Sequence, residues 1–264
     1  MLRHSVVAKL MASWLLVAGL LSATWCLANP LPATIDKVRS SIVAIGTVRP
    51  VKAVKAKGIP IKFMGTGFVV GNGQHVITNL HVLPDNLDTK NGEVLSVFAG
   101  RGSGAKSTPA RIKAVDAVHD LALLELEGRG LQPLTLAKDA YIREGSDLAF
   151  TGFPIGMVLG LYPVTHRATV SAITPLVIPA HSSASLTPEH IKRLRHPFEV
   201  YQLDAVAYPG NSGSPLYDVN NGSVLGVINS VFVKETKENV LQKPSGITYA
   251  IPIRYANKLI SENP

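Results

Sequence analysis

The sequence predicts an all-β fold arranged as two β-barrels, and three observations carry that prediction. Short runs of apolar and β-branched residues recur along the chain, and turn residues separate them, with 22 glycines and 18 prolines spread throughout. Asn72-Gly73 and Asn221-Gly222 each lie between two such runs, where they predict two-residue hairpins. Helical signals are confined to two segments, 188–196 and 252–260. With 264 residues, 46% of them hydrophobic, the chain can bury the cores of two small domains.

Taken in order, the chain begins with residues 29–41, which we expect to be a linker and first turn. The basic segment 49–62 contains Pro50, Gly58 and Pro60 and is expected to be an exposed loop. Glycines at 128 and 130 predict a link between the two halves. Strands are expected at 42–48, 65–71, 75–79, 94–98, 111–115 and 121–126, then at 147–152, 167–173, 200–204, 215–217, 223–229 and 246–250.

Each of the two helical segments has its own signal. The first has Thr187 as N-cap and Pro188 at its first position, a pairing typical of helix starts. In the second, apolar residues recur at the spacing that places them on one face. Those residues are Pro252, Tyr255, Ala256, Leu259 and Ile260.

The first 28 residues have the pattern of a secretory signal peptide. Basic residues precede a mostly apolar run over 10–23, and residues 26–28 offer a small-x-small cleavage site. Because residues 10–28 nearly reach spanning length, a retained membrane anchor stays an alternative, although polar residues interrupt the apolar run. A lipid anchor at Cys26 is disfavoured by the bulky Trp25 before it.

Cys26 is the only cysteine, so a protein cleaved after residue 28 cannot be held together by disulfides. An exported domain without disulfides fits a bacterial periplasm better than eukaryotic secretion. The sequence therefore predicts a periplasmic or secreted bacterial protein, with no stable membrane span after signal cleavage.

The formal net charge is +8 at pH 7, with basic clusters within 49–62 and 192–195. Aromatic residues do not interleave with either cluster, which argues against a nucleic-acid partner and favours a role in solubility. The glycine-rich segment 100–107 differs from a phosphate-binding loop, because Ala105 replaces the glycine before its lysine and Pro109 would interrupt the following helix. We expect a polar hairpin loop there.

The stretch Pro209-Gly210-Asn211-Ser212-Gly213-Ser214-Pro215-Leu216 presents a serine hydroxyl on a tightly turned backbone. Glycines allow backbone conformations closed to other residues and leave N–H groups uncovered. An acyl-transfer site uses both features, because it combines a nucleophile with donors for the oxygen that becomes negative. The same pattern also occurs in ordinary turns, so a base and an orienting acid elsewhere must decide.

Eight histidines compete for the role of base. His81 stands apart because it lies just beyond a predicted strand, where the chain turns, although a histidine there is often structural. The others have a simpler explanation, at a strand start, beside an aspartate, within a polar segment or in the leader. They are His75, His166, His119, His181, His190, His196 and His4.

Asp120 is the best candidate for the orienting acid. It opens the apolar run 121–124, which predicts a buried strand, and a carboxylate there is costly unless it accepts hydrogen bonds. Taken alone, it is better explained as a strand-end aspartate that bonds backbone N–H groups. Asp116, Asp147 and Asp204 are weaker candidates.

The order His81, Asp120, Ser212 is that of chymotrypsin-type enzymes. Around these residues, seven segments resemble, in order, the trypsin-like fold in its HtrA/Deg-type bacterial branch, over about residues 35 to 260. They are 65–68, 76–82, 120–124, 152–156, 203–205, 209–216 and 249–252. The resemblance implies two six-stranded antiparallel β-barrels of the chymotrypsin-like kind with a short C-terminal helix. The barrel over 29–127 would carry the histidine and aspartate, and the barrel over 128–264 the serine.

By this resemblance Ser212 is the nucleophile, His81 the general base and Asp120 the residue that orients the imidazole. The backbone N–H groups of Gly210 and Ser212 would form the oxyanion hole. Four features depart from the family or from its digestive relatives. Ser214 stands where glycine is usual, Asn211 replaces the aspartate of a zymogen switch, residues 174–198 are expected to form an insertion, and no PDZ domain is expected after the second barrel.

The resemblance also places a substrate pocket, with Val206 on its floor, six residues before the serine. One wall would come from the strand over 226–231, including Asn229, Ser230 and Val231. Two valines and no acid imply a preference for small or medium aliphatic side chains.

The sequence as a whole predicts an exported serine endopeptidase that cleaves unfolded or damaged proteins and needs no metal or cofactor. Its partners would be polypeptide substrates, and the family resemblance alone leaves a trimer open. The alternative is a protease-fold protein that binds peptides, or acts as a chaperone, with little hydrolysis.

Overall fold

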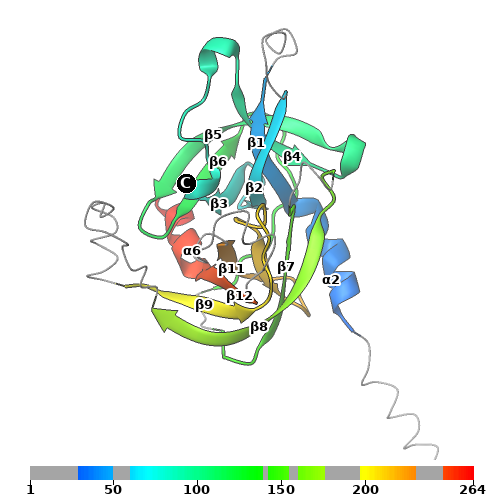
Figure 1. Ribbon diagram of the computed structural model, residues 1–264, viewed down its shortest axis with the longest axis vertical. Coiled ribbons are helices and arrows are strands. Elements are labelled where there is room, and N and C mark those ends of the chain that lie inside the picture. The colour runs from blue at the N-terminus through cyan, green and yellow to red at the C-terminus, as the bar shows by residue number, and fades with distance from the viewer. Residues whose placement is uncertain (1–28, 50–59, 139–141, 155–159, 176–196, 230–245) are drawn as a thin grey trace, which may run out of the picture.

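The computed structural model describes residues 29–49, 60–138, 142–154, 160–175, 197–229 and 246–264. Within them, twelve strands form two closed, six-stranded antiparallel barrels, shown one above the other in Figure 1. The predicted fold class is therefore confirmed. The expected signal segment and the expected helix over 188–196 lie outside the described residues.

The first barrel closes in the order β1-β2-β3-β6-β5-β4. A closed barrel pairs the backbone of every strand on both sides and leaves no open sheet edge. Its strands are β1 (Ile42–Val48), β2 (Ile61–Val70), β3 (His75–Asn79), β4 (Val94–Ala99), β5 (Lys106–Asp116) and β6 (Leu121–Leu126). Short 3₁₀ turns lie between some of them: η3 (Leu80–Val82), η4 (Thr89–Asn91) and η5 (Gly102–Gly104).

The second barrel closes in the order β10-β11-β12-β9-β8-β7. Its strands are β7 (Asp147–Gly152), β8 (Val164–Pro175), β9 (Glu199–Asp204), β10 (Pro215–Asp218), β11 (Val224–Asn229) and β12 (Ile247–Pro252). Thr174 and Pro175, expected at the start of the insertion, belong to β8 and pair with β9. Residues 176–196 of the expected insertion lie outside the described residues.

Two α-helices lie among the described residues, and the sequence predicts one of them. The C-terminal helix α6 (Ile253–Ser261) buries Ile253, Ala256 and Leu259 and contacts strands of both barrels. The other, α2 (Leu31–Val38), falls where a linker was expected, and that expectation is wrong. Helix α2 leads into η1 (Arg39–Ser41) and packs on the β10–β11 turn, where Oγ1 of Thr34 donates to the carbonyl of Val219 at 2.9 Å.

Both hairpins form, but neither has the predicted two-residue turn. Residues 71–74 connect β2 to β3, and residues 219–223 connect β10 to β11. In the first connection, Oδ1 of Asn72 accepts the backbone N–H of Gln74 at 3.0 Å. Gly73 has φ +90° and lies so close to Leu131 that a β-carbon there would sit 2.3 Å from its carbonyl oxygen. Contact with the chain beyond β6 therefore explains this wider turn.

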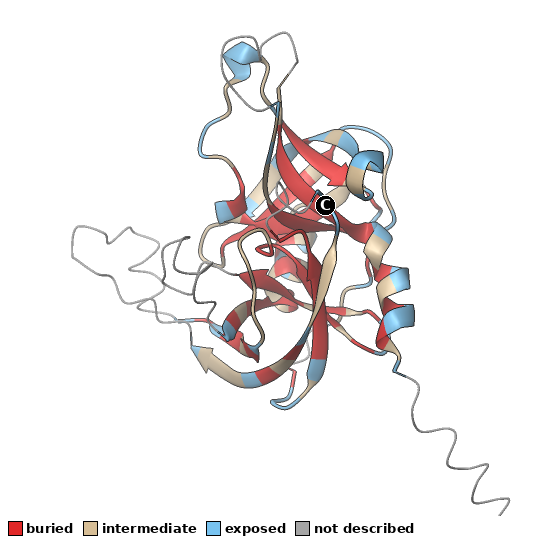
Figure 2. Ribbon diagram, turned by 45° about the vertical axis from the view of Figure 1, so that its right-hand side comes forward, coloured by how far each residue is buried: buried red, intermediate tan, exposed pale blue. Residues whose placement is uncertain are grey.

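The strands carry the core, as the buried positions in Figure 2 show. One apolar cluster extends across both barrels and includes Phe68 and Leu121 of the first and Tyr217 and Val227 of the second. Each barrel adds a cluster of its own. The barrels thus share a packed junction, which can hold side chains from both in a fixed geometry. Of the helices in the described ranges, none has the length and hydrophobicity needed to span a membrane.

Candidate active site

His81 and Asp120 meet at one end of a pair of antiparallel strands. Strands β3 and β6 pair with Asn79 opposite Leu121, so a residue just after β3 lies beside a residue just before β6. Nδ1 of His81 is 2.6 Å from Oδ2 of Asp120, and the backbone N–H of His81 donates to Oδ1 at 2.9 Å. Both carboxylate oxygens therefore hold the same histidine.

The backbone of Asp120 is in an uncommon conformation. Its φ is +55°, in the left-handed region that non-glycine residues rarely occupy. Its carbonyl accepts the backbone N–H of Leu80 at 3.1 Å and the side-chain amide of Asn79 at 3.0 Å. These bonds from the end of β3 hold the buried carboxylate at the barrel junction.

Asn229 reaches this carboxylate from the second barrel. Its Nδ2 donates to Oδ2 of Asp120 at 2.6 Å, and the side chain is fully buried. Asn229 was expected in a pocket wall, and its side chain instead faces Asp120, so only its backbone remains for such a wall. A lone amide at the end of a buried apolar strand was the available signal, but its partner lies 109 positions away.

The loop that carries Ser212 is tightly turned, as its glycines predict. The backbone N–H of Asn211 donates to the carbonyl of Tyr208, and that of Ser214 donates to the carbonyl of Asn211, both at 3.0 Å. Gly213 has φ +85°, and a β-carbon there would lie 2.0 Å from the carbonyl oxygen of Thr66. Only glycine fits this position without displacing the first barrel.

Thr66 fastens the serine loop to the first barrel. Its backbone N–H donates to the carbonyl of Ser212 at 2.9 Å, and its hydroxyl donates to the carbonyl of Gly210 at 2.7 Å. Beside it, a β-carbon on Gly65 would lie 2.7 Å from a methyl of Val82 and 3.1 Å from the carbonyl of Ser212. The residue after His81 and the loop of Ser212 thus flank the same glycine.

Ser214, where the resemblance expects glycine, is accommodated by a glycine elsewhere. It is fully buried, and a β-carbon on Gly152 would lie only 2.1 Å from its Oγ. The same β-carbon would lie 2.7 Å from Oδ1 of Asn211. The absence of a side chain at Gly152 therefore leaves room beneath the serine loop.

The other candidate residues in the described ranges do not join this site. His119 pairs with Asp116, Nδ1 to Oδ2, at 2.5 Å. Burial, and secondarily the charge of Lys113, lowers the pKa of His75, whereas burial alone lowers the pKa of His166, whose ring stacks on Phe150 at 4.8 Å. Asp147 and Asp204 are exposed at strand ends, and His181, His190 and His196 fall outside the described residues.

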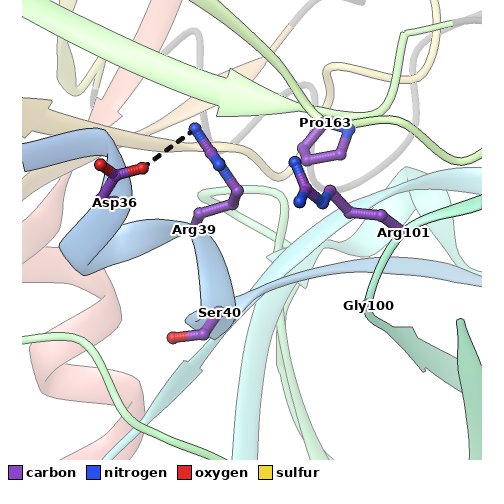
Figure 3. A pocket seen from close by; sticks show the side chains of 6 residues that line it. All are labelled: Asp36, Arg39, Ser40, Gly100, Arg101 and Pro163. Atoms are coloured by element: carbon purple, nitrogen blue, oxygen red, sulfur yellow. Dashed lines mark ion pairs between the residues drawn. The ribbon is translucent and has the colours of Figure 1, made fainter. Parts of the chain in front are cut away.

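The predicted pocket is only partly described. Val206 is half-buried two residues after β9, whereas Ser230 and Val231 lie outside the described residues. A separate cavity of about 260 Å³ opens between η1, the loop after β4 and the residue before β8 (Figure 3). Two arginines face it, and one of them, Arg39, pairs with Asp36 at 3.4 Å. The residues that line it are Asp36, Arg39, Ser40, Gly100, Arg101 and Pro163. None of the three predicted catalytic residues is among them.

Residues 65–227 match the family of the trypsin-like peptidase domain. The chain belongs to this family. The match begins at Gly65, beside the Ser212 loop, and includes all three predicted catalytic residues. The resemblance to trypsin-like peptidases is thereby confirmed. Among the described residues of this trypsin-like peptidase, no three histidine, cysteine, aspartate or glutamate side chains gather as a metal site would require.

Relatives of this trypsin-like peptidase include mitochondrial HTRA2 serine proteases. Those of Drosophila pseudoobscura pseudoobscura and Drosophila virilis are 29% and 28% identical over 191 residues. The alignment covers 72% of this chain but 37% of each relative, so the chain spans less than half of their length.

Solved structures share the fold of this trypsin-like peptidase at low identity. The active form of the Mycobacterium tuberculosis protease Rv3671c superposes with a TM-score of 0.61 at 22% identity, over 87% of this chain and 83% of that one. The HtrA-type protease AlgW, solved with a tripeptide, gives 0.60 at 20% identity, over 89% and 63%.

Proposed function

We propose that the protein is a serine endopeptidase in which His81, Asp120 and Ser212 act together. The observation that carries the proposal is the double hold of Asp120 on His81, at the junction where the Ser212 loop is fastened by Thr66. Because Asp120 accepts a hydrogen bond from the N–H at Nδ1, the histidine keeps the tautomer whose Nε2 has a free lone pair. That nitrogen can then accept the proton of the serine hydroxyl.

The chemistry follows from this tautomer. Oγ of Ser212 attacks the carbonyl carbon of the peptide as its proton passes to His81, and the backbone N–H groups of Gly210 and Ser212 bind the oxygen that becomes negative. His81 then returns the proton to the leaving amine, which leaves an acyl group on the serine. Water, deprotonated by the same histidine, releases the acid and restores the enzyme.

The proposal extends to substrate and location. With Val206 and Val231 around it, the pocket would favour small aliphatic side chains, since a buried lysine or arginine would lack a partner charge. Unfolded or damaged polypeptides after export are the proposed substrates, as the resemblance to HtrA-type proteases implies. Digestion of a peptide library checks the preference, and dominant cleavage after arginine, lysine or glutamate would overturn the pocket assignment.

Peptide turnover by matched variants tests the proposed hydrolysis. We expect Ser212→Ala to lower kcat by roughly 10⁶, with the fold intact. Ser214→Ala changes a serine of the same loop and should retain turnover, because its Oγ lies beneath the loop beside Gly152. A folded wild-type protein that binds peptides without cleaving them would favour the binding or chaperone alternative. Comparable turnover by wild type and Ser212→Ala would exclude the serine mechanism.

A further inference from the structure

A second histidine–aspartate pair lies directly beside the proposed triad. His119 precedes Asp120 in the chain, and its Nδ1 is 2.5 Å from Oδ2 of Asp116. Oδ1 of Asp116 accepts the backbone N–H groups of Val118 and His119, both at 3.1 Å. The carboxylate of Asp116 therefore closes the turn between β5 and β6, and this turn ends at Asp120.

The carboxylate of Asp116 is held in its charged form. Burial raises the pKa of this carboxyl, but the hydrogen bond and charge of His119, together with the two backbone bonds, outweigh burial and keep the pKa below its ordinary value. A hydrogen bond to an ionised carboxylate is shorter and stronger than one between neutral groups. The imidazole of His119 is thus fixed on one edge by Asp116.

Aromatic residues of the second barrel hold the faces and edges of the same imidazole. The ring of His119 stacks on Tyr255 of α6, with centroids 3.9 Å apart and planes 19° apart. Phe198, just before β9, meets it edge-on at 4.7 Å, and also meets Tyr255 at 5.5 Å. The guanidinium of Arg254 lies 5.5 Å from the centre of the Tyr255 ring. Residues of the second barrel therefore pack around His119, the residue that precedes Asp120 in the chain.

This arrangement bears on Asp120 because its backbone is strained. A left-handed φ of +55° persists at a non-glycine residue only when surrounding contacts over-determine it. Asn79 and Leu80 hold the carbonyl of Asp120 from β3 and η3. On the other side of Asp120 in the chain, the side chain of His119 holds the preceding residue in place.

We propose that His119 is a positioning residue: fixed by Asp116 and clamped by Tyr255 and Phe198, it sets the backbone of Asp120 and couples packing between the barrels to the orientation of His81. The inference rests on the proposed function, since it gives Asp120 a catalytic partner to orient. His119 itself exchanges no proton with the substrate.

Three substitutions separate positioning from simple packing. His119→Phe keeps a ring between Tyr255 and Phe198 but removes the bond to Asp116. His119→Ala removes both the ring and the bond. Asp116→Asn keeps an oxygen that can accept the two backbone N–H groups but removes the charge. His75→Phe is the matched control, because His75 lies at the far end of β3 from His81.

Steady-state kinetics on a cleaved peptide provide the readout. We expect His119→Phe to lower kcat by about 10- to 100-fold, with KM within about twofold, because small displacements of catalytic groups slow turnover without weakening binding. Asp116→Asn should lower kcat less. The double variant should be no slower than His119→Phe alone, since both changes break one interaction. His75→Phe should keep wild-type kcat.

The pH profile adds a readout that packing alone would not move. A well-placed carboxylate favours the protonated form of a neighbouring imidazole. If Asp120 moves away from His81, the acid limb of kcat/KM should therefore shift to lower pH in His119→Phe. Circular dichroism and thermal melting, run in parallel, confirm that each variant is folded.

Wild-type kcat and an unmoved acid limb in folded His119→Phe would overturn the inference, as would a raised KM with kcat unchanged. If His119→Ala fails to fold, the phenylalanine variant still decides the question. Absence of turnover in the folded wild-type protein would refute the proposed function instead, so the two failures are distinguishable.

Discussion

Among single residues, Asp120 is held from several sides at the junction. Its carboxylate bonds His81 of its own barrel twice and Asn229 of the other barrel once, and its backbone has a left-handed φ. A buried carboxylate is costly unless several donors surround it. The donors found here satisfy that need and at the same time orient His81.

Asn229 should therefore matter for turnover, although it takes no part in the proposed proton transfers. We expect Asn229→Ala to lower kcat by about 10- to 100-fold, because a hydrogen bond to a charged group contributes ~1.5–3 kcal/mol. Asn220→Ala, in the exposed turn between β10 and β11, serves as the control and should change kcat little. Peptide cleavage rates measured on folded protein check the comparison, and equal rates for the two variants would show that Asp120 does not need the amide.

At the scale of elements, the site depends on how the Ser212 loop is joined to β2. Thr66 donates hydrogen bonds to the carbonyls on both sides of Asn211, those of Gly210 and Ser212. The backbone of Gly213 in turn passes close to the carbonyl of Thr66. The loop is thus shaped by its glycines and fastened by one threonine. Its geometry depends on contact between barrels and not on the loop alone.

Gly213→Ala tests this arrangement. A β-carbon would lie 2.0 Å from the carbonyl oxygen of Thr66, and φ of +85° is unfavourable for alanine. We expect activity to fall below about a hundredth of wild type and the free energy of unfolding to fall by at least ~1–2 kcal/mol. Gly104→Ala is the matched control, since a β-carbon there would have no neighbouring atom within 4 Å. Urea titration and peptide turnover measure both effects, and an active Gly213→Ala protein would contradict the assigned loop geometry.

For the molecule as a whole, a partly buried histidine links stability to pH. Burial lowers the pKa of His166 below its ordinary value of 6.5, and the ring stacks on Phe150 inside the second barrel. Above pH 6.5 the imidazole is neutral in both the folded and the unfolded chain and has no effect. Below pH 6.5 the unfolded chain binds a proton that the folded protein excludes, so the free energy of unfolding falls until the pH reaches the folded pKa.

His166→Phe should reduce this dependence, because phenylalanine can stack on Phe150 but cannot take up a proton. We expect the loss of stability between about pH 7.5 and 5.5 to be smaller in the variant than in wild type. Some loss of stability toward lower pH should remain in the variant, because the pKa of His75 is also lowered. Urea unfolding at the two pH values measures it, and identical losses in both proteins would show that His166 is not the source.

Much of this architecture was predictable, because strand patterns and turn residues are local signals. The serine was a candidate from its glycine-rich turn, and the histidine after β3 and the aspartate before β6 from their positions relative to apolar runs; only their order and the family resemblance joined the three. Helix α2 was not predicted, although Leu31, Ile35 and Val38 have helical spacing, because a helix of 8 residues offers little more than two turns of periodic signal. Hairpin lengths and the bond from Asn229 to Asp120 were not predictable, since they depend on contacts between residues far apart in the chain.

We propose that Ser212 is an activated nucleophile, and covalent labelling of this serine is the direct test. A fluorophosphonate reacts with a serine that a neighbouring base has activated. Mass spectrometry of the intact protein and of its proteolytic peptides should show one adduct on wild type, located at Ser212. Ser214→Ala should be labelled in the same way, whereas Ser212→Ala should remain unlabelled. An unlabelled folded wild-type protein, or an adduct that persists in Ser212→Ala, would contradict the assignment.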